Sequence, residues 1–149
     1  MASTKAEDLI RGSAHPVARE QGGARPGWGV WAGRIIGALP VVAMVMSSAM
    51  KLARQPQVIE LFAGKLGYPE SALAALAVVE LSCTVLYAIP RTAVLGAILM
   101  TGYLGGAVAT HVRVGDVFAI PLALGILAWV GLYLRDARLR ALVPLRRRA

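Results

Sequence analysis

The chain has 149 residues, of which 57% are hydrophobic and 16% are charged, and its formal net charge is +8. Soluble domains are nearer half apolar and a quarter charged, so this composition and a mean hydropathy of +0.62 exclude an ordinary soluble domain. A single cysteine, Cys83, excludes an internal disulfide and a dithiol redox mechanism within the chain, because both need two thiols.

The first segment, residues 1–29, is polar and contains several Pro and Gly residues. It lacks the apolar core of a signal peptide, so we predict a disordered cytoplasmic arm. Trp28 and Trp31 then mark a membrane interface, where amphipathic rings prefer to lie. We expect an integral membrane domain to follow over residues 30–135.

The first predicted span covers about residues 33–53. Gly33 and Gly37 stand four residues apart and give one helix face small side chains, which favours close packing on a neighbouring helix. Pro40 lies inside the span and is expected to kink it, because proline removes a backbone hydrogen bond.

Polar side chains lie at the end of this first predicted span. Ser47, Ser48 and Lys51 lie within about one helical turn of one another. Two interpretations stay open: the three form one polar spot inside the protein, or Lys51 extends along the helix to the lipid headgroups.

The longest connection follows at residues 54–70, and its apolar residues recur at helical spacing. This pattern predicts a short amphipathic helix between the first and second spans, lying on the outer membrane surface. Gly67 is expected to end that helix, and Pro69 directly after it supports the same end point.

The second predicted span covers about residues 71–89, with Ser71 as a candidate N-cap and Glu80 near its centre. An ionisable group in hydrocarbon costs at least about 2.5 kcal/mol unless it is paired. We therefore predict that Glu80 faces the interior, is protonated, or both. The alternative is a structural role in which Glu80 ties helices together by hydrogen bonds.

The third predicted span covers about residues 92–113 and carries two overlapping pairs of small residues. The pairs predict a close approach by a neighbouring helix, and they are Gly102 with Gly106 and Gly105 with Ala109. Polar residues end the span: Thr110, His111 and Arg113.

A turn at Gly115 and Asp116 leads into the fourth predicted span at about residues 117–134, which has Pro121 near its start. Residues 136–149 form a basic tail. Because the tail directly follows an apolar run, we interpret it as a cytoplasmic anchor on anionic lipid and not as a nucleic-acid site.

Charge predicts the orientation of the four spans. An even number of spans places both termini on one side, and that side would hold twelve of the sixteen basic residues. Because basic residues are retained in the cytoplasm, we predict an all-α, four-helix membrane bundle with both termini cytoplasmic.

This topology brings polar residues from three spans to similar depths. At about 1.5 Å rise per residue, Glu80 lies level with Tyr103, and Thr110 and His111 lie one or two turns nearer the outside. We therefore predict an outward pocket lined by Ser47, Ser48, Lys51, Glu80, Tyr103, Thr110, His111 and Arg113.

Each member of this pocket also has a purely structural interpretation, such as a core tyrosine or an interfacial arginine. A metal site is not expected, because the chain has two histidines and His15 lies in the arm. No catalytic triad or phosphate-binding loop is recognisable, so we assign no catalytic residue.

The order of several short motifs resembles the DoxX-like family of small four-helix membrane proteins, over about residues 34–148. The motifs are Leu66 to Pro69 (LGYP), Glu80, Pro90-Arg91, Gly102-Tyr103, Gly105-Gly106-Ala107, and His111 with Gly115-Asp116. The resemblance implies a multi-pass protein of the bacterial inner membrane. Relatives include a membrane subunit of thiosulfate:quinone oxidoreductase and proteins associated with complexes that handle oxidative and thiol stress.

From the pocket and the resemblance we expect an accessory subunit, or a protein that binds a small lipophile such as a quinone, without a covalently bound cofactor. Partners would be membrane lipid, a redox protein or a second copy of the chain. One alternative is a quinone-linked oxidoreductase in which Glu80 and His111 relay protons. A transporter of a small solute or protons is less favoured, because four helices leave little room for alternating access.

Overall fold

A computed structural model describes residues 27–142, and within this range the protein is helical without strands. The all-α prediction is therefore confirmed for these residues. The predicted arm before residue 27 and the end of the basic tail after residue 142 lie outside the described residues. Two helices are long and apolar enough to cross a membrane: α2 (Trp28–Leu52) and α5 (Ala93–Arg113). Two further apolar helices have 17 residues each: α4 (Ala72–Ala88) and α6 (Ala119–Arg135).

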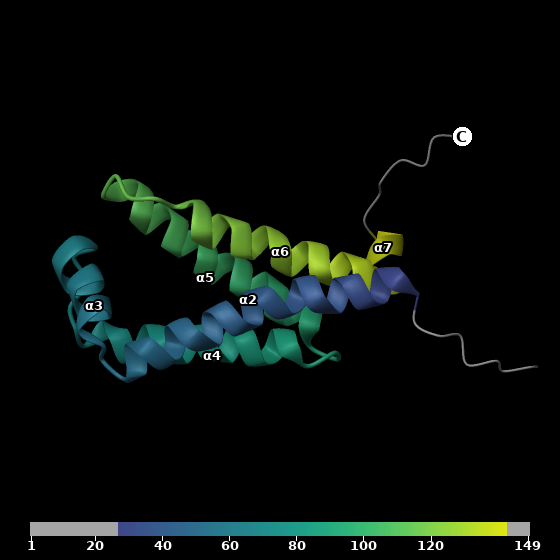
Figure 1. The fold of residues 1–149 in the computed structure, drawn as a ribbon, viewed down its shortest axis with the longest axis horizontal. Helices are drawn as coiled ribbons and strands as arrows, with labels where there is room; N and C mark the ends of the chain where they lie inside the picture. The colour runs from purple at the N-terminus through teal and green to yellow at the C-terminus, as the bar shows by residue number, and fades with distance from the viewer. Residues whose placement is uncertain (1–26, 143–149) are drawn as a thin grey trace, which may run out of the picture.

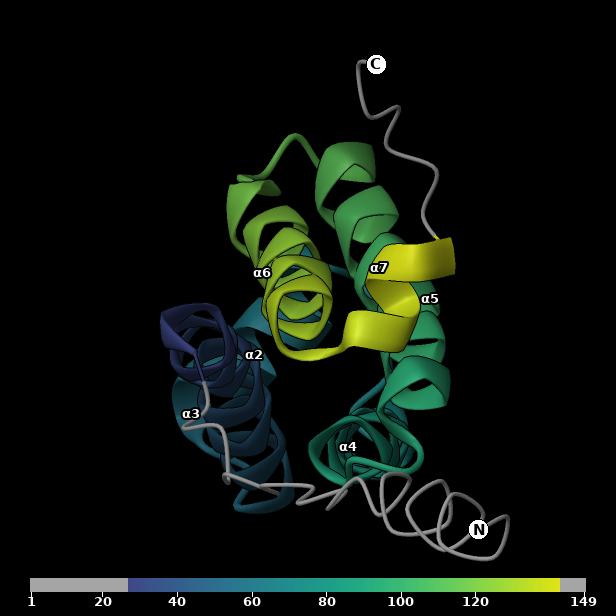
Figure 2. The ribbon, with the colours of Figure 1, turned by 90° about the vertical axis from the view of Figure 1, so that its right-hand side faces the viewer.

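The four long helices lie side by side, each in contact with two others (Figures 1 and 2). Both α2 and α5 pack against α4 and against α6. At one end of the molecule lie α3 (Pro56–Ile59) and the π-helix η1 (Glu60–Lys65), and we call this the cap end. At the other end, the tail end, lie the start of α2 and the short helix α7 (Ala137–Leu142).

Local details differ from the sequence predictions at two places. The first helix begins at Trp28, before the predicted residue 33, and runs on through Pro40 as a single helix. Ser71 stands at the predicted N-cap position, but its backbone is already helical and its side chain makes no capping hydrogen bond. The predicted turn at Gly115 is present, with a φ of 68° that favours glycine.

Glycines let α2 and α6 touch at the tail end. A Cβ placed on Gly131 would lie 2.6 Å from the Cα of Gly37, and one on Gly33 would lie 2.8 Å from the carbonyl oxygen of Gly131. The predicted small-residue face at Gly33 and Gly37 thus lies against a neighbouring backbone. From this contact the two helices diverge toward the cap end (Figure 1).

Among residues 27–142, the predicted close approach at the second small-residue face is not found. Added Cβ atoms on Gly102, Gly105 and Gly106 would meet nothing within 4 Å, and Ala109 is exposed. The physical reason is that α5 turns another face inward, where its buried residues are Ala93, Gly96, Ala97, Met100 and Leu104. A tight contact that the sequence analysis missed lies at Gly96, whose Cβ would stand 2.1 Å from the backbone nitrogen of Tyr87.

The connection between α2 and α4, predicted as one amphipathic helix, is instead α3 followed by η1. We call residues 56–68 the cap segment. Its helical part ends just before Gly67, whose φ of 73° stops the helix as predicted. Val58 and Leu66 are buried, and Phe62 is half-buried. The cap segment therefore packs its apolar side onto the space between the diverging helices.

We predict that Gly131→Ala destabilises the protein by about 1–3 kcal/mol, because its methyl group would collide with the backbone of α2. Gly105→Ala is the matched control: it adds the same methyl group to a helix, but into open space, and should be neutral or stabilising by up to about 1 kcal/mol. Reversible unfolding in detergent micelles measures both changes. Equal effects of the two variants would contradict the packing described here.

Candidate functional site

A buried ion pair joins α2 to α4. Lys51 Nζ lies 2.8 Å from Glu80 Oε2, and each side chain is 4% exposed. The same ammonium donates to Ser47 Oγ and stands 5.2 Å from the centre of the Phe62 ring. Lys51 therefore points into the protein and not toward the headgroups, which decides between the two interpretations left open by the sequence.

Helical spacing explains why these two side chains meet. On α2 the buried residues Met44, Ser48 and Lys51 follow one another at intervals of four and three, which is one helix face. On α4 the buried face includes Ala77, Glu80 and the residues one turn on either side. Because α2 packs against α4, the two faces lie opposite each other and bring the charges together.

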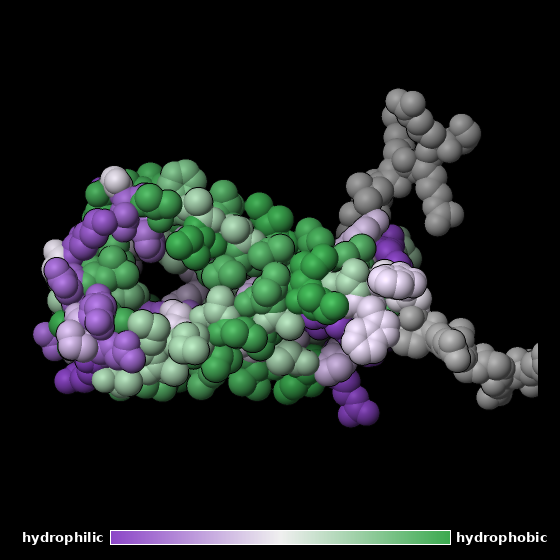
Figure 3. All heavy atoms as spheres, in the orientation of Figure 1, coloured by the Kyte–Doolittle hydropathy of each residue, from purple (hydrophilic) through white to green (hydrophobic). Residues whose placement is uncertain are grey.

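The ion pair lies in the wall of a cavity at the cap end, which we call the central cavity. Its volume is about 310 Å³, and it is bounded by α2, η1, α4, α5 and α6. The space-filling view shows a hollow at this end of the molecule (Figure 3). Five of the eight residues predicted for the pocket line it: Ser47, Lys51, Glu80, Tyr103 and His111.

One hydrogen bond sets the tautomer of His111. Its Nδ1 lies 2.8 Å from the carbonyl oxygen of Ala107. Because a carbonyl only accepts, this contact requires the proton on Nδ1, and in the tautomer so defined Nε2 is an acceptor. The cavity wall therefore offers an ammonium, a carboxylate, a phenol hydroxyl and an imidazole nitrogen within otherwise apolar surroundings.

The other three predicted residues lie elsewhere. Arg113 is exposed and donates to the carbonyl oxygen of Leu66 at 2.6 Å, so it does not supply a cation to the cavity. Thr110 also lies outside the central cavity and bonds to Tyr68. Ser48 is 1% exposed, and its hydroxyl has no partner among the described residues.

Three contacts fasten the cap segment to the end of α5 and the turn after it. Arg113 holds the carbonyl of Leu66, Tyr68 OH lies 2.9 Å from Thr110 Oγ, and Lys65 Nζ lies 2.8 Å from Asp116 Oδ1. The hydrogen bond from Lys65 lowers the pKa of Asp116 below its ordinary 3.8, and the amide of Val117 adds to this. The cap segment is thus held over the central cavity by side chains from α5 and from the turn after it.

Sequence reasoning missed the apolar walls of the central cavity. Leu61 and Phe62 come from η1, Val117 lies in the connection just before α6, and α6 supplies Ile120, Pro121 and Leu124. Only Phe62 carried a usable signal, since it stands one helical turn after the buried Val58. The residues of α6 have no feature that distinguishes a cavity wall from a lipid-facing surface.

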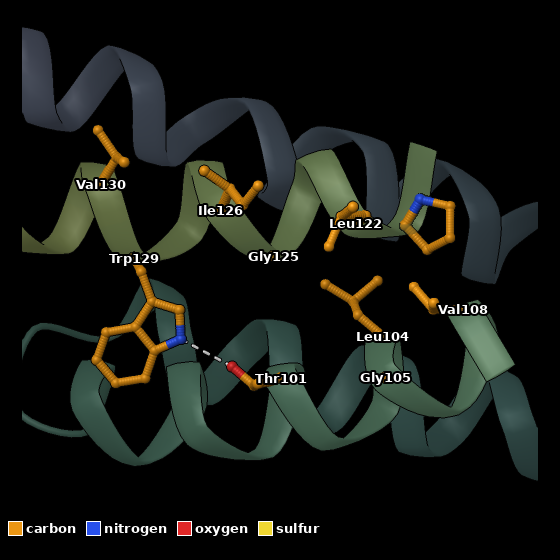
Figure 4. A pocket seen from close by; sticks show the side chains of 10 residues that line it. Thr101, Leu104, Gly105, Val108, Leu122, Gly125, Ile126, Trp129 and Val130 are labelled. Carbon is orange, nitrogen blue, oxygen red and sulfur yellow. Dashed lines mark hydrogen bonds between the residues drawn. The ribbon is translucent and has the colours of Figure 1, made fainter. Parts of the chain in front are cut away.

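A separate groove between α5 and α6 has a larger volume, about 400 Å³, but no titratable side chain lines it (Figure 4). Gly105 and Gly125 lie along it, and Trp129 Nε1 donates to Thr101 Oγ at 2.8 Å. With so few polar groups it offers little to orient a ligand. The central cavity is therefore the candidate functional site.

The central cavity suits a small molecule with an apolar body and hydrogen-bonding groups. Its charged and polar side chains can donate to a carbonyl oxygen or accept from a hydroxyl. Among residues 27–142, no three His, Cys, Asp or Glu side chains gather closely enough to hold a metal ion.

Comparison with known proteins gives one match. A family model described as the DoxX-like family matches residues 23–131. No curated protein and no solved structure matches the chain.

We predict that Lys51→Met alone destabilises the protein by about 3–5 kcal/mol, because it leaves the buried carboxylate of Glu80 without a counter-charge. The double variant Lys51→Met/Glu80→Leu should recover most of this loss, since an apolar pair needs no charge compensation. Unfolding in detergent micelles tests both variants. Equal destabilisation by the single and double variants would show that the pair does not act as a unit.

We predict that the contact between Lys65 and Asp116 weakens in acid. A lowered folded-state pKa means that this contact stabilises the folded protein above the unfolded pKa and is lost as pH falls through the folded pKa. The difference in Tm between the wild type and Asp116→Asn should therefore be present at pH 6 and shrink only as pH falls below 3.8 and through the lowered folded pKa. Glu70→Gln, an exposed residue beside the cap segment, is the control. A Tm difference that persists unchanged at low pH would contradict the assignment.

Proposed function

The chain belongs to the DoxX-like family, and from this premise we propose that it is a multi-pass protein of the bacterial inner membrane. In this proposal α2, α4, α5 and α6 cross the bilayer as a four-helix bundle with both termini in the cytoplasm. Two of these helices pass the length and hydropathy criteria for a span. The 17-residue helices α4 and α6 stand at the lower limit of about 17–25 residues for crossing a bilayer.

The exposed surface supports this membrane assignment. Large apolar side chains are more than half exposed on every long helix, among them Ile35 at 61%, Val78 at 58%, Ile98 at 54% and Ile126 at 56%. Apolar residues cover the middle of the molecule, whereas hydrophilic residues gather at the cap end (Figure 3). In water such a surface would promote aggregation, whereas in lipid it faces a matching solvent.

We further propose that the central cavity binds a small lipophile with carbonyl or hydroxyl groups, a quinone being the best candidate, and that the protein is an accessory subunit in membrane redox chemistry. The observation that carries this proposal is the buried Lys51–Glu80 pair in the wall of an otherwise apolar cavity. Replacing a buried pair by apolar residues is often neutral or stabilising, so stability alone does not explain its presence. Ionisable residues within membranes usually mark a functional site.

The roles follow from the chemistry of each group. The ammonium of Lys51 would donate to a ligand carbonyl, and Nε2 of His111 would accept from a ligand hydroxyl. The rings of Phe62 and Tyr103 would pack against a planar ligand. Because Glu80 and His111 line the same cavity, they could also exchange protons with a bound quinone that receives electrons from a redox partner.

We predict that the purified protein in nanodiscs binds a short-chain benzoquinone, and that Lys51→Met/Glu80→Leu weakens this binding by about tenfold or more. A tenfold loss corresponds to about 1.4 kcal/mol, a modest value for one charged hydrogen bond. Quenching of tryptophan fluorescence measures the affinity. Arg54→Gln is the control, because Arg54 is an exposed basic residue just beyond α2 and does not line the cavity.

Unchanged binding by a correctly folded double variant would refute the proposed site. The same preparation separates the two functional alternatives. If the wild type alone reduces the quinone with an added electron donor and Glu80→Gln does not, the protein is an enzyme. If it binds quinone but shows turnover only with a partner oxidoreductase, it is an accessory subunit.

A further inference from the structure

A second cavity lies on the side of the molecule, between the cap segment, α4 and α5. We call it the lateral cavity; its volume is about 240 Å³. The cap segment supplies Phe62, Leu66 and Tyr68, and Leu76 comes from α4. The wall from α5 consists of Gly102, Tyr103, Gly106, Ala107, Thr110 and His111.

The lateral and central cavities share part of their lining. Phe62, Tyr103 and His111, together with Ala107, line both of them. These residues therefore form a shared wall between the two spaces, which we call the partition. Rotamer changes of partly exposed side chains are fast, so a ligand can displace the partition without moving a helix.

The polar groups of the lateral cavity are mostly occupied. The hydroxyl of Thr110 donates to the carbonyl of Gly106 at 2.9 Å, and Tyr68 OH is its partner on the other side at 2.9 Å. Nδ1 of His111 is bonded to the carbonyl of Ala107. Apart from Nε2 of His111 and the hydroxyl of Tyr103, what remains for a ligand is apolar surface and the open space over Gly102 and Gly106, where an added Cβ meets nothing within 4 Å.

We infer that the lateral cavity holds the hydrocarbon tail of a ligand whose polar head lies in the central cavity. This inference rests on the proposed function and narrows the ligand class to head-and-tail lipophiles with an alkyl or prenyl chain. The head would reach Lys51 and Glu80, and the tail would pass the partition and leave between α4 and α5 into the bilayer. The open glycines of α5 thus provide a passage for a chain.

The surrounding lipid determines how much such a tail site can contribute to binding. The tail is already surrounded by hydrocarbon in a bilayer, so the lateral cavity adds little hydrophobic driving force. The lateral cavity contributes open volume. A tail can extend from a bound head group only if no side chain blocks its path. Filling that room should harm tailed ligands and leave tail-free ligands unaffected.

Gly106→Leu tests this directly, and Gly105→Leu is its matched control. Both glycines are exposed neighbours on the same helix and meet open space, but Gly106 lines the lateral cavity and Gly105 lines the groove between α5 and α6. Binding of a tail-free benzoquinone and of a benzoquinone with a ten-carbon chain is measured in nanodiscs. We expect Gly106→Leu to weaken binding of the tailed ligand by about tenfold, while the tail-free ligand and both ligands with Gly105→Leu change by less than about twofold.

Several results would overturn the inference. They are an unchanged affinity of Gly106→Leu for the tailed ligand, an equal loss for both ligands, or an equal effect of Gly105→Leu. In each of these cases wild-type binding would still support the proposed function. Failure of the wild type to bind either ligand would refute the proposed function itself, and the tail site with it.

Discussion

The buried contact between Lys51 and Glu80 constrains the rest of the structure. Neither charge is stable alone in an apolar interior, so α2 and α4 must keep the register that holds the ammonium against the carboxylate. Ser47 and the Phe62 ring complete the surroundings of the ammonium, which links the cap segment to the same point. The pair lies in the wall of the central cavity, so the same contact places an ammonium and a carboxylate beside that space.

The helices α2 and α6 pack differently at the two ends of the molecule. At the tail end, glycines on α2 and α6 bring two backbones into contact, and few other residues would fit there. At the cap end the same helices have diverged, and residues 56–68 close part of the opening. A rigid contact at one end and a fastened segment at the other leave a defined space between them, which is the arrangement that a binding site needs.

The sequence predicted the parts of this arrangement that depend on composition and spacing. Glu80 could be assigned to the interior because a carboxylate facing lipid is costly, and the glycines of α2 could be assigned to a contact face. The spacing of Gly102 and Gly106 is the same, yet no helix in the described part of the chain lies against them, since a small-residue face shows only that close approach is possible. The bond from Arg113 to the cap segment joins residues 47 positions apart, and no local pattern encodes it.

The π-helix η1 limits how far the length of this connection can change. In η1 the amide of Leu66 reaches back five residues to the carbonyl of Leu61, one more than in an α-helix, so the segment accommodates a surplus residue. Removing one residue here would let ordinary helical bonding resume and would swing the following side chains by about 100° around the axis. Phe62 and Leu66 could then no longer both face inward. Insertions and deletions should therefore be tolerated poorly in this connection, although surface loops usually accept them.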